Sequence, residues 1–468
     1  MKKEIITLMM VATVMSVSSQ SKVFYVELKD DVAITESPVL EYKQNVSFTE
    51  PTKGAVLTLF PEMKFQIIDG IGGTFNEIGG VALMALPQDE REKVMSNLFS
   101  ESGANFSLCR TAVGSSDFGV DDYSYSEVAN DYKMKHFSID RERSSMIPYM
   151  QIALKYNPSM QLFASPWSPP AWMKYSGEMD KGDVMRDKNF LIDDPEIYKA
   201  YALYFSKYIE HYAKEGITVD RLLIQNENDI HTKYPSCVVP IDQMYEFISK
   251  YLRPQFEKDN IETEIWAGTF RTSGVLDGVE FVKNKKYLAA VEGVGIQYST
   301  SDHISDMKYF APEAKIMHTE CKCYNRKNSN VQAFSRLEEI ASYINYGVTN
   351  FVYWNMILNE TGRSGWEWKQ NSLINIDRET KKVTYNPDYA VMSLFSKFIR
   401  PGSVRIGSHT REEAITVMSG DNIYIFVKND GKEVRNYDCR DRATKVIAKA
   451  SVPAESIAVI VIPSSLAQ

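Results

Sequence analysis

The sequence has few cysteines, no long apolar segment after its first residues and no excess of positive charge. Five cysteines in 468 residues, an odd number at wide spacing, do not describe a disulfide framework. A net charge of −8, without a stripe of lysine and arginine, argues against a nucleic-acid partner. Beyond the N-terminus no apolar run is long enough to cross a bilayer, so we expect no membrane span.

One short segment has the composition of a metal cluster. Cys321-Lys-Cys323 follows shortly after His318. However, a single residue between two cysteines is not the usual zinc spacing, and the chain has no second pair to complete a site. We therefore predict neither a metal nor a cofactor.

The first residues have the pattern of a secretory signal peptide. Two lysines at positions 2 and 3 precede an apolar stretch over 5–17, and Val17 and Ser19 are small residues at the positions that a signal peptidase reads. The sequence predicts that residues 1–19 are removed and that the protein is secreted or periplasmic.

The central part of the chain, residues 63–400, alternates short apolar runs with amphipathic helices, as βα units do. The clearest helix has Asp194 as its N-cap, Pro195 in its first turn and Gly216 beyond its end. The predicted strands cover 69–75, 104–113, 161–167, 221–227, 262–270, 291–298, 314–320 and 349–354. Eight strands separated by helices predict an α/β fold, a (β/α)₈ TIM barrel.

A second unit is predicted from the two ends of the chain. Past residue 401 the helical pattern stops, and the strands expected over 413–418, 422–427, 444–448 and 456–462 are separated by turns. Strand-like segments over 22–62 precede the barrel. We expect these N-terminal strands to complete a C-terminal β-sandwich over 401–468.

Two carboxylates stand out because each follows a predicted barrel strand. Glu227 follows the fourth strand and Glu320 ends the seventh, and these two strand ends face each other across a closed barrel. Such a pair suits glycoside hydrolysis, in which one acid protonates the leaving oxygen and the other attacks the anomeric carbon from ~5–5.5 Å away. Taken alone, Glu227 fits a solvated loop equally well.

Other polar and aromatic residues lie at the same predicted edge. Asn226 could bind a sugar 2-hydroxyl or cap a helix. Arg110 and Asp117 could bind each other or a pair of sugar hydroxyls, and Arg110 could equally form a buried salt bridge. Trp167 and Trp354 could be sugar platforms or core residues.

The last predicted substrate contacts follow the sixth and eighth strands. Gln297 and Tyr298 end strand six, whereas Trp366 and Trp368 lie in the loop after strand eight. Alternation with Gly365 and Glu367 predicts that both tryptophans are exposed when no ligand covers them.

The ordered motifs of the chain resemble those of glycoside hydrolase family 30. The matching segments are 66–75, 110–118, 165–174, 225–227, 318–320 and 353–355. The resemblance implies a retaining β-glycosidase with a TIM barrel and a β-sandwich side domain, which acts on an oligo- or polysaccharide. It puts Glu227 at the acid/base and Glu320 at the nucleophile. It puts further residues at the sugar-binding positions of the −1 subsite, namely Arg110, Asp117, Trp167, Asn226 and Trp354.

Segments 354–358, 365–372 and 385–387 are most similar to the secreted β-1,6-glucanase branch of that family. The chain departs from this branch at Cys321-Lys-Cys323 and at Gln297-Tyr298, so linkage preference and endo or exo action stay open. The alternatives are a glucosylceramidase-like or other exo-acting β-glycosidase and, from another class, a non-catalytic carbohydrate-binding barrel. The last would need neither Glu227 nor Glu320.

Overall fold

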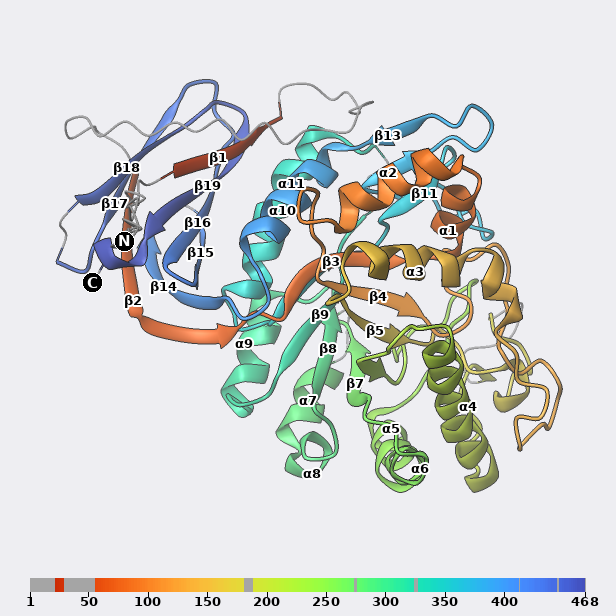
Figure 1. The fold of residues 1–468 in the computed structure, drawn as a ribbon. Coiled ribbons are helices and arrows are strands. Elements are labelled where there is room, and N and C mark those ends of the chain that lie inside the picture. Colours follow the sequence, from red (N-terminus) through yellow and green to blue (C-terminus); the bar gives the residue numbers. More distant parts are fainter. Residues whose placement is uncertain are drawn as a thin grey trace, which may run out of the picture.

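The computed structural model shows an eight-stranded parallel barrel beside an all-β side domain (Figure 1). The described residues are 22–28, 55–180, 188–272, 276–323, 327–411, 413–443 and 446–467. The predicted signal peptide lies outside them. Within these ranges, no helix has both the length and the apolar character needed to cross a bilayer.

All eight predicted barrel strands are present and parallel, which confirms the TIM barrel. They are β3 (Gly70–Phe75), β4 (Leu108–Ala112), β5 (Gln161–Ser165), β6 (Arg221–Leu223), β7 (Glu264–Phe270), β8 (Gly293–Gln297), β9 (Ile316–Glu320) and β10 (Asn350–Tyr353). Their order is β10-β3-β4-β5-β6-β7-β8-β9. A side chain helps to close the ring, because Asn350 bonds both the N–H and the carbonyl of His318 on β9 at 2.8 Å.

Large apolar side chains fill the barrel interior. Leu108, Phe163, Leu223, Trp266, Met317 and Val352, from six different strands, form one buried cluster. Gly293 is required beside it, because a Cβ there would lie 2.3 Å from the Trp266 ring. The barrel is therefore a packed core, and its chemistry has to lie at the strand ends.

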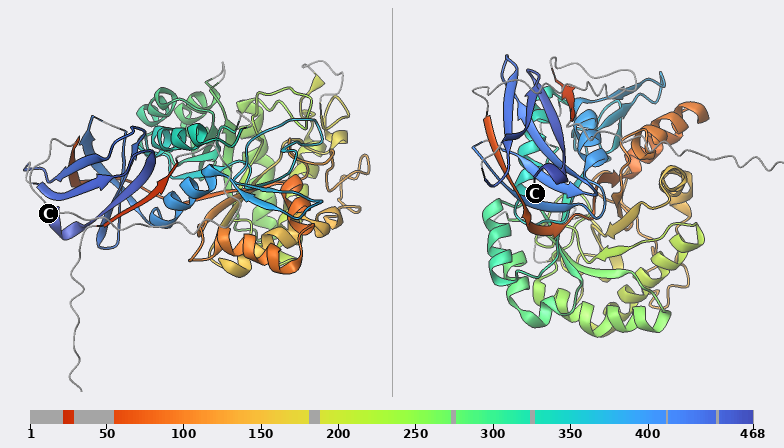
Figure 2. Two further views of the ribbon diagram at one scale, coloured as in Figure 1. Left: turned by 90° about the horizontal axis from the view of Figure 1, so that it is seen from above. Right: turned by 60° about the vertical axis from the view of Figure 1, so that its left-hand side comes forward.

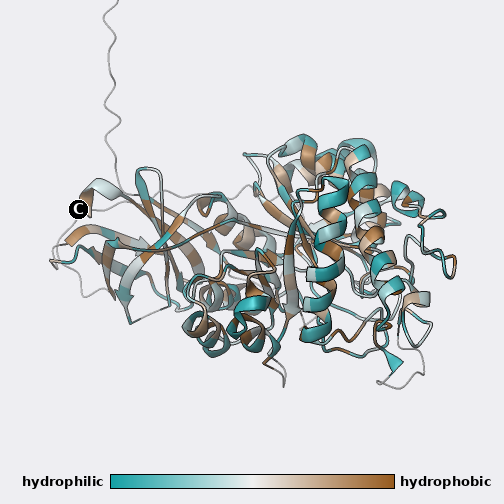
Figure 3. Cartoon of the chain, turned by 90° about the horizontal axis from the view of Figure 1, so that it is seen from below, coloured by the Kyte–Doolittle hydropathy of each residue, from teal (hydrophilic) through white to brown (hydrophobic). Residues whose placement is uncertain are grey.

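The helices surround the barrel (Figure 1). They are α1 (Glu77–Met84), α2 (Gln88–Phe99), α3 (Met146–Tyr156), α4 (Pro195–Lys214), α5 (Ile241–Phe247), α6 (Arg253–Asp259), α7 (Asp277–Lys283), α8 (Lys285–Leu288), α9 (Ser301–Phe310), α10 (Asn330–Ile344) and α11 (Pro387–Phe398). The α4 helix begins as predicted, with the Asp194 side chain accepting from the Glu196 and Ile197 amides. Brown and teal alternate along these helices in Figure 3, because one face packs on the barrel and the other meets solvent.

The side domain contains strands from both ends of the chain, which confirms a β-sandwich side domain. Its strands are β1 (Lys22–Glu27), β2 (Ala55–Ile67), β14 (Val404–Thr410), β15 (Ile415–Ser419), β16 (Asn422–Asn429), β17 (Arg435–Arg440), β18 (Val446–Val452) and β19 (Ser456–Pro463), in the order β1-β19-β16-β15-β14-β2-β17-β18. The outer strands β1 and β18 contact each other, so the sheet folds back around an apolar core. The β2 strand runs on to Ile67, beyond the predicted boundary at 62, and the domain boundaries stay predictions.

The side domain packs at one end of the barrel domain (Figure 2). The contact is aromatic: Phe426 of β16 stacks on Phe395 of α11 with ring centroids 4.6 Å apart, and Phe24 of β1 meets Phe398 at 5.0 Å. A third, small sheet was not predicted. Its strands are β11 (Ile357–Asn359), β12 (Ile374–Ile376) and β13 (Val383–Tyr385), and it frames the loop that carries Trp366 and Trp368.

Candidate active site

Both predicted carboxylates lie at the carboxyl edge of the barrel. Glu320 is the last residue of β9, and Glu227 follows β6 in a tight turn. The side chains are buried, with relative exposures of 5% for Glu320 and 6% for Glu227. Glu227 has a φ of 44°, a left-handed conformation that costs free energy and persists only where the surroundings hold it.

Arg110 of β4 joins the two sides of the site. Its Nη1 donates to Glu320 Oε2 at 2.7 Å, and its Nη2 donates to Asn226 Oδ1 at 2.7 Å. Asn226 directly precedes Glu227. The Arg110 guanidinium therefore binds the Glu320 side chain directly and also holds the residue next to Glu227. Ser165 accepts two further bonds from Arg110.

The Glu320 carboxylate is surrounded by donors. Tyr298 OH donates to Oε1, while Arg110 and the Gln297 amide, the latter at 3.4 Å, donate to Oε2. Burial is the largest influence and leaves the pKa of Glu320 above its ordinary value, although the Arg110 charge and the three hydrogen bonds lower it. These contacts favour the ionised carboxylate, the form that can attack carbon.

Glu227 has a different environment. Its backbone N–H donates to Thr269 Oγ1 at 3.0 Å, and the Arg271 Nε lies 3.9 Å from its Oε1. Arg271 itself forms a fork with Asp229, at 2.8 and 3.1 Å. Burial first, and then the negative charge of Glu320, raise the pKa of Glu227 to about 8. Glu227 therefore holds a proton at neutral pH.

Asp117 does not form an ion pair with Arg110, which was one of the alternatives predicted from the sequence. Arg110 bonds Glu320 instead, and Asp117 Oδ1 is buried with no hydrogen-bond partner among the described residues. Burial and the charges of Glu320 and Glu227 raise the pKa of Asp117 well above its usual range. A ligand hydroxyl at this point would satisfy an acceptor that the protein leaves open.

The two predicted aromatic platforms lie against each other. Trp167 and Trp354 are stacked with centroids 5.1 Å apart, and the Arg110 guanidinium lies 4.5 Å from the Trp167 ring. Trp354 Nε1 is a second buried group for which the described ranges offer no partner. Both rings are almost fully buried, so neither presents an open face as a sugar platform.

The prediction that Trp366 and Trp368 are exposed is wrong, because both are half-buried. Neighbouring loops cover them. Trp366 Nε1 donates to Asp180 at 3.4 Å, its carbonyl accepts from Lys233 at 2.7 Å, and Trp368 packs on the main core.

Two residues near the carboxylates were missed. Arg271 directly follows β7, so the strand-end rule that selected Glu227 applies to it as well. Tyr234 lies in the loop after β6, and burial and the charges of Glu227, Asp117 and Glu320 raise its pKa far above the usual value. Nothing in the sequence around Tyr234 distinguishes it from the many other tyrosines.

The cysteine segment does not form a metal cluster. The sulfurs of Cys321 and Cys323 lie 3.5 Å apart, and the His318 ring stacks on Phe351 with centroids 4.1 Å apart. In the part of the chain that the structure covers, no three histidine, cysteine or acidic side chains are arranged to hold a metal.

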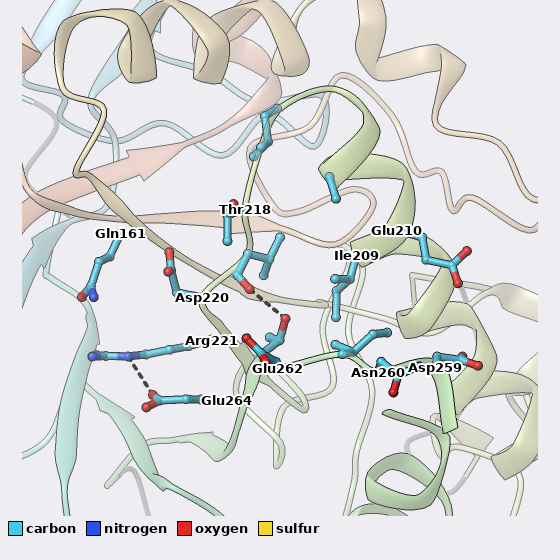
Figure 4. Close-up of a pocket in the computed structure, with 15 residues that line it drawn as sticks. Gln161, Ile209, Glu210, Thr218, Asp220, Arg221, Asp259, Asn260, Glu262 and Glu264 are labelled. Carbon is cyan, nitrogen blue, oxygen red and sulfur yellow. Dashed lines mark hydrogen bonds and ion pairs between the residues drawn. The ribbon is translucent and has the colours of Figure 1, made fainter. Parts of the chain in front are cut away.

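A groove of about 590 Å³ lies at the amino-terminal end of the barrel strands, opposite the edge that carries Glu227 and Glu320 (Figure 4). Gln161, Arg221 and Glu264, which begin β5, β6 and β7, line it. Because Glu227 lies beyond the carboxyl end of β6, this groove is separated from both catalytic candidates by the packed barrel. Arg221 pairs there with Asp69 and Glu264, an arrangement that serves stability.

The sequence is similar to those of known proteins. Among relatives, a putative glucosylceramidase 3 of Caenorhabditis elegans is 29% identical over 84% of this chain and 76% of its own length. An endo-1,6-beta-D-glucanase of Neurospora crassa is 25% identical over 80% of this chain and 76% of its own.

Two solved structures have the same fold. SrfJ from Salmonella typhimurium has a TM-score of 0.81 at 21% identity, and the endo-beta1,6-glucanase BT3312 has 0.76 at 19%; each match covers 95% of this chain and 99% of the other. Residues 68–399 match the model of the glycosyl hydrolase family 30 TIM-barrel domain. The chain therefore belongs to glycoside hydrolase family 30.

Proposed function

We propose that the protein is a retaining β-glycosidase that hydrolyses β-1,6-linked glucan by double displacement, with Glu320 as nucleophile and Glu227 as acid/base. The observation that carries the assignment is the contrast between the two carboxylates. Donors surround Glu320 and favour its charge, whereas burial beside Glu320 raises the pKa of Glu227 to about 8. Two acids whose environments differ in this way suit the two roles.

The residues support each step of such a reaction. A Glu320 oxygen would bond to the anomeric carbon while the bond from that carbon to the leaving oxygen breaks, and Glu227 would give its proton to that oxygen. Glu227 would then take a proton from water as the water oxygen displaces Glu320. Arg110 and Tyr298 would hold Glu320 in place throughout, because both already bond to it.

The substrate site is proposed around these two residues. Asp117 and Trp354 offer an acceptor and a donor that sugar hydroxyls can satisfy. The remaining predicted sugar contacts are Arg110, Trp167, Asn226, Gln297, Tyr298, Trp366 and Trp368. Because neighbouring loops partly cover Trp366 and Trp368, these side chains would contact a sugar only at the edge of the substrate site and would not offer it a fully open ring face.

Relatives favour two substrates. Endo-1,6-glucanases of Neurospora crassa and Trichoderma harzianum support β-1,6-glucan, as do the motifs after β10. The second candidate is glucosylceramide, favoured by the higher identity to the putative glucosylceramidase of Caenorhabditis elegans. Hydrolysis of pustulan, gentio-oligosaccharides, laminarin, xylan and glucosylceramide, with the product lengths, separates them. The signal-like sequence of residues 1–19 supports export, and a mature chain beginning at Gln20 would establish it.

The assignment is tested by removing each carboxylate and supplying azide. We expect Glu320→Ala to lose turnover by about 10⁵–10⁶-fold on every substrate. Azide would then attack from the vacated face and give the α-glycosyl azide, whereas Glu227→Ala with an activated aryl glucoside would give the β-glycosyl azide. Removal of an exposed carboxylate, in Glu379→Ala, is the matched control. Normal activity of Glu320→Ala would refute the assignment, and interchanged azide products would reverse the two roles.

A further inference from the structure

A second groove lies on the same rim of the barrel as Glu227. It has a volume of about 390 Å³, within the usual range for small-ligand sites, and lies where α4 and α5 begin. Its walls come from the segment after β5 and the segment after β6, since Tyr175 belongs to the first and Pro240 to the second. The Gln243 side chain of α5 bonds Tyr198 of α4 at 2.9 Å and fixes the spacing of the two helices.

One wall of the groove is an exposed aromatic ring held in place. Tyr175 is 52% exposed. Its hydroxyl accepts from the Asp193 amide at 3.2 Å, and its backbone N–H donates to the Phe190 carbonyl at 3.1 Å. A ring fixed at both ends is a ready stacking surface for the C–H face of a sugar, at little cost in conformational entropy.

The rest of the groove is rich in hydrogen-bond acceptors. Asp193, Asp242 and Glu246 line it, and each already accepts one hydrogen bond, from Tyr198, Tyr287 and Lys250 respectively. The described lining itself includes neither lysine nor arginine, which argues against a phosphate or other anion. The carboxylates come from separate segments, and none belongs to a group of three that could hold a metal in the described ranges. Separated acceptors beside an aromatic ring suit the spaced hydroxyl groups of a sugar.

The groove lies in the sector of the barrel that carries the proposed acid. Lys174, next to Tyr175, is buried, and its Nζ donates to the carbonyls of Met179 and Ser236, which joins the segments after β5 and β6. Glu227 precedes Ser236 in the second of these segments. The groove and Glu227 therefore lie in segments that Lys174 ties to each other.

We propose that this groove is a second carbohydrate site, outside the catalytic centre, which binds β-glucan chains with Tyr175 as its stacking platform. The proposal rests on the proposed function, because it takes the same polymer as ligand. Its effect is to keep a long substrate near the catalytic rim, so it should matter for a polymer and not for a disaccharide, which the catalytic site alone can hold.

The test is affinity electrophoresis in gels that contain pustulan, carried out on full-length chains with Glu320→Ala so that the polymer is not consumed. We expect Tyr175→Ala to lower retention at least fivefold relative to the parent. Tyr309→Ala is the matched control, since Tyr309 at the end of α9 is 80% exposed and lies outside the groove. In the active chain, Tyr175→Ala should reduce kcat/KM on pustulan at least fivefold more than on gentiobiose, and Tyr309→Ala should change neither.

Equal retention of the Tyr175→Ala and Tyr309→Ala proteins would overturn the groove and leave the proposed function intact. Equal losses on pustulan and gentiobiose would overturn it too, because they would place Tyr175 in the catalytic site or in general stability. Failure of the wild-type chain to hydrolyse pustulan is a separate outcome, which removes the β-1,6-glucan specificity and with it the ligand proposed for the groove.

Discussion

At the scale of single residues, the site depends on the different charged neighbours of Glu227 and Glu320. Arg110 contacts Glu320 directly but reaches Glu227 only through Asn226. The cation nearer to Glu227, Arg271, is already engaged by Asp229. The Arg110 charge therefore stabilises the Glu320 carboxylate directly. The Arg271 charge is farther from Glu227 and is shared with Asp229. The unequal positive charge beside the two carboxyl groups follows from this arrangement of two arginines.

The first prediction concerns Glu227→Gln, which keeps the shape of the side chain and removes its proton. We expect kcat/KM on glucan to fall by about 10²–10⁴-fold, the usual contribution of a general acid. Hydrolysis of a dinitrophenyl glucoside should fall far less in its first step, because that leaving group needs no protonation.

The pH profile of the wild type provides the second measurement of this prediction. Burial raises the pKa of Glu227 to about 8, so kcat/KM on glucan should decline above about pH 8 as its proton is lost. In Glu227→Gln the alkaline decline should disappear, since glutamine does not titrate there. An unchanged alkaline limb in the variant would assign that limb to another group.

Residue positions were easier to predict from the sequence than residue contacts. Glu227 and Glu320 were found because each follows an apolar run, and parallel strands bring such ends to one edge. Arg110 was expected at the same edge but is the third of the five residues of β4. The partner of Arg110 was not determined, because choosing between Asp117 and Glu320 requires knowing which side chains meet across the barrel. Likewise, the cover over Trp366 comes from Asp180 and Lys233, which are distant in sequence.

At the scale of elements, the long segment after β4 that carries Asp117 is tied to the barrel by a buried carboxylate. Glu142 accepts hydrogen bonds from the hydroxyls of Tyr123 and Tyr125 at 2.7 Å and of Tyr212, on α4, at 2.5 Å. The Tyr125 hydroxyl also accepts from the Gly114 amide, just after β4. These contacts hold both ends of the segment.

The second prediction uses the protonation of Glu142. Burial raises its pKa to about 7, against about 4.5 in the unfolded chain. Between these values the folded protein binds more protons than the unfolded chain, so the contribution of Glu142 to stability is largest at low pH and is lost as the pH rises through 7. Glutamine does not titrate, so the free energy of unfolding of the wild type minus that of Glu142→Gln should fall by about 3 kcal/mol from pH 4.5 to pH 8.

Urea denaturation across this pH range measures the difference. Other buried carboxyl groups, such as Asp117, are common to both proteins and cancel in the subtraction. Parallel stability curves for the two proteins would show that Glu142 keeps an ordinary pKa and that the tyrosines hold it as an ion.

Strands were predictable where they are apolar throughout, and not where one face is polar. The eight barrel strands were found from the short apolar runs that each contains or adjoins, because both of their faces are covered. β14 and β17 were missed, since Arg405, His409, Arg435 and Asp438 interrupt their patterns. The three-residue strands β11, β12 and β13 are too short to show any period.

At the scale of the whole molecule, β1 shows why the chain should unfold as one body. Val23 and Tyr25 pack in the side-domain core, whereas Val26 belongs to the cluster that includes the barrel. Phe24 meets Phe398 of α11, and Phe395 of the same helix stacks on Phe426. The side domain therefore contributes apolar side chains to the cluster that includes the barrel. Sequence patterns cannot show this, because the spacing of hydrophobic residues does not say which residues they pack against.

The last prediction tests this coupling with Phe426→Ala. Phe426 is fully buried on β16, and removing its ring should lower the free energy of unfolding by about 3–5 kcal/mol, the usual cost of such a cavity. Val434→Ala, at an exposed position of the same domain, should change it by less than about 0.5 kcal/mol. If the two domains are one cooperative unit, thermal loss of glycosidase activity, which reports the barrel, should shift by as much as the loss of β-structure seen by circular dichroism. A variant that keeps the barrel transition at its wild-type temperature while the side domain melts earlier would show instead that the Phe395–Phe426 stack joins two independently stable bodies.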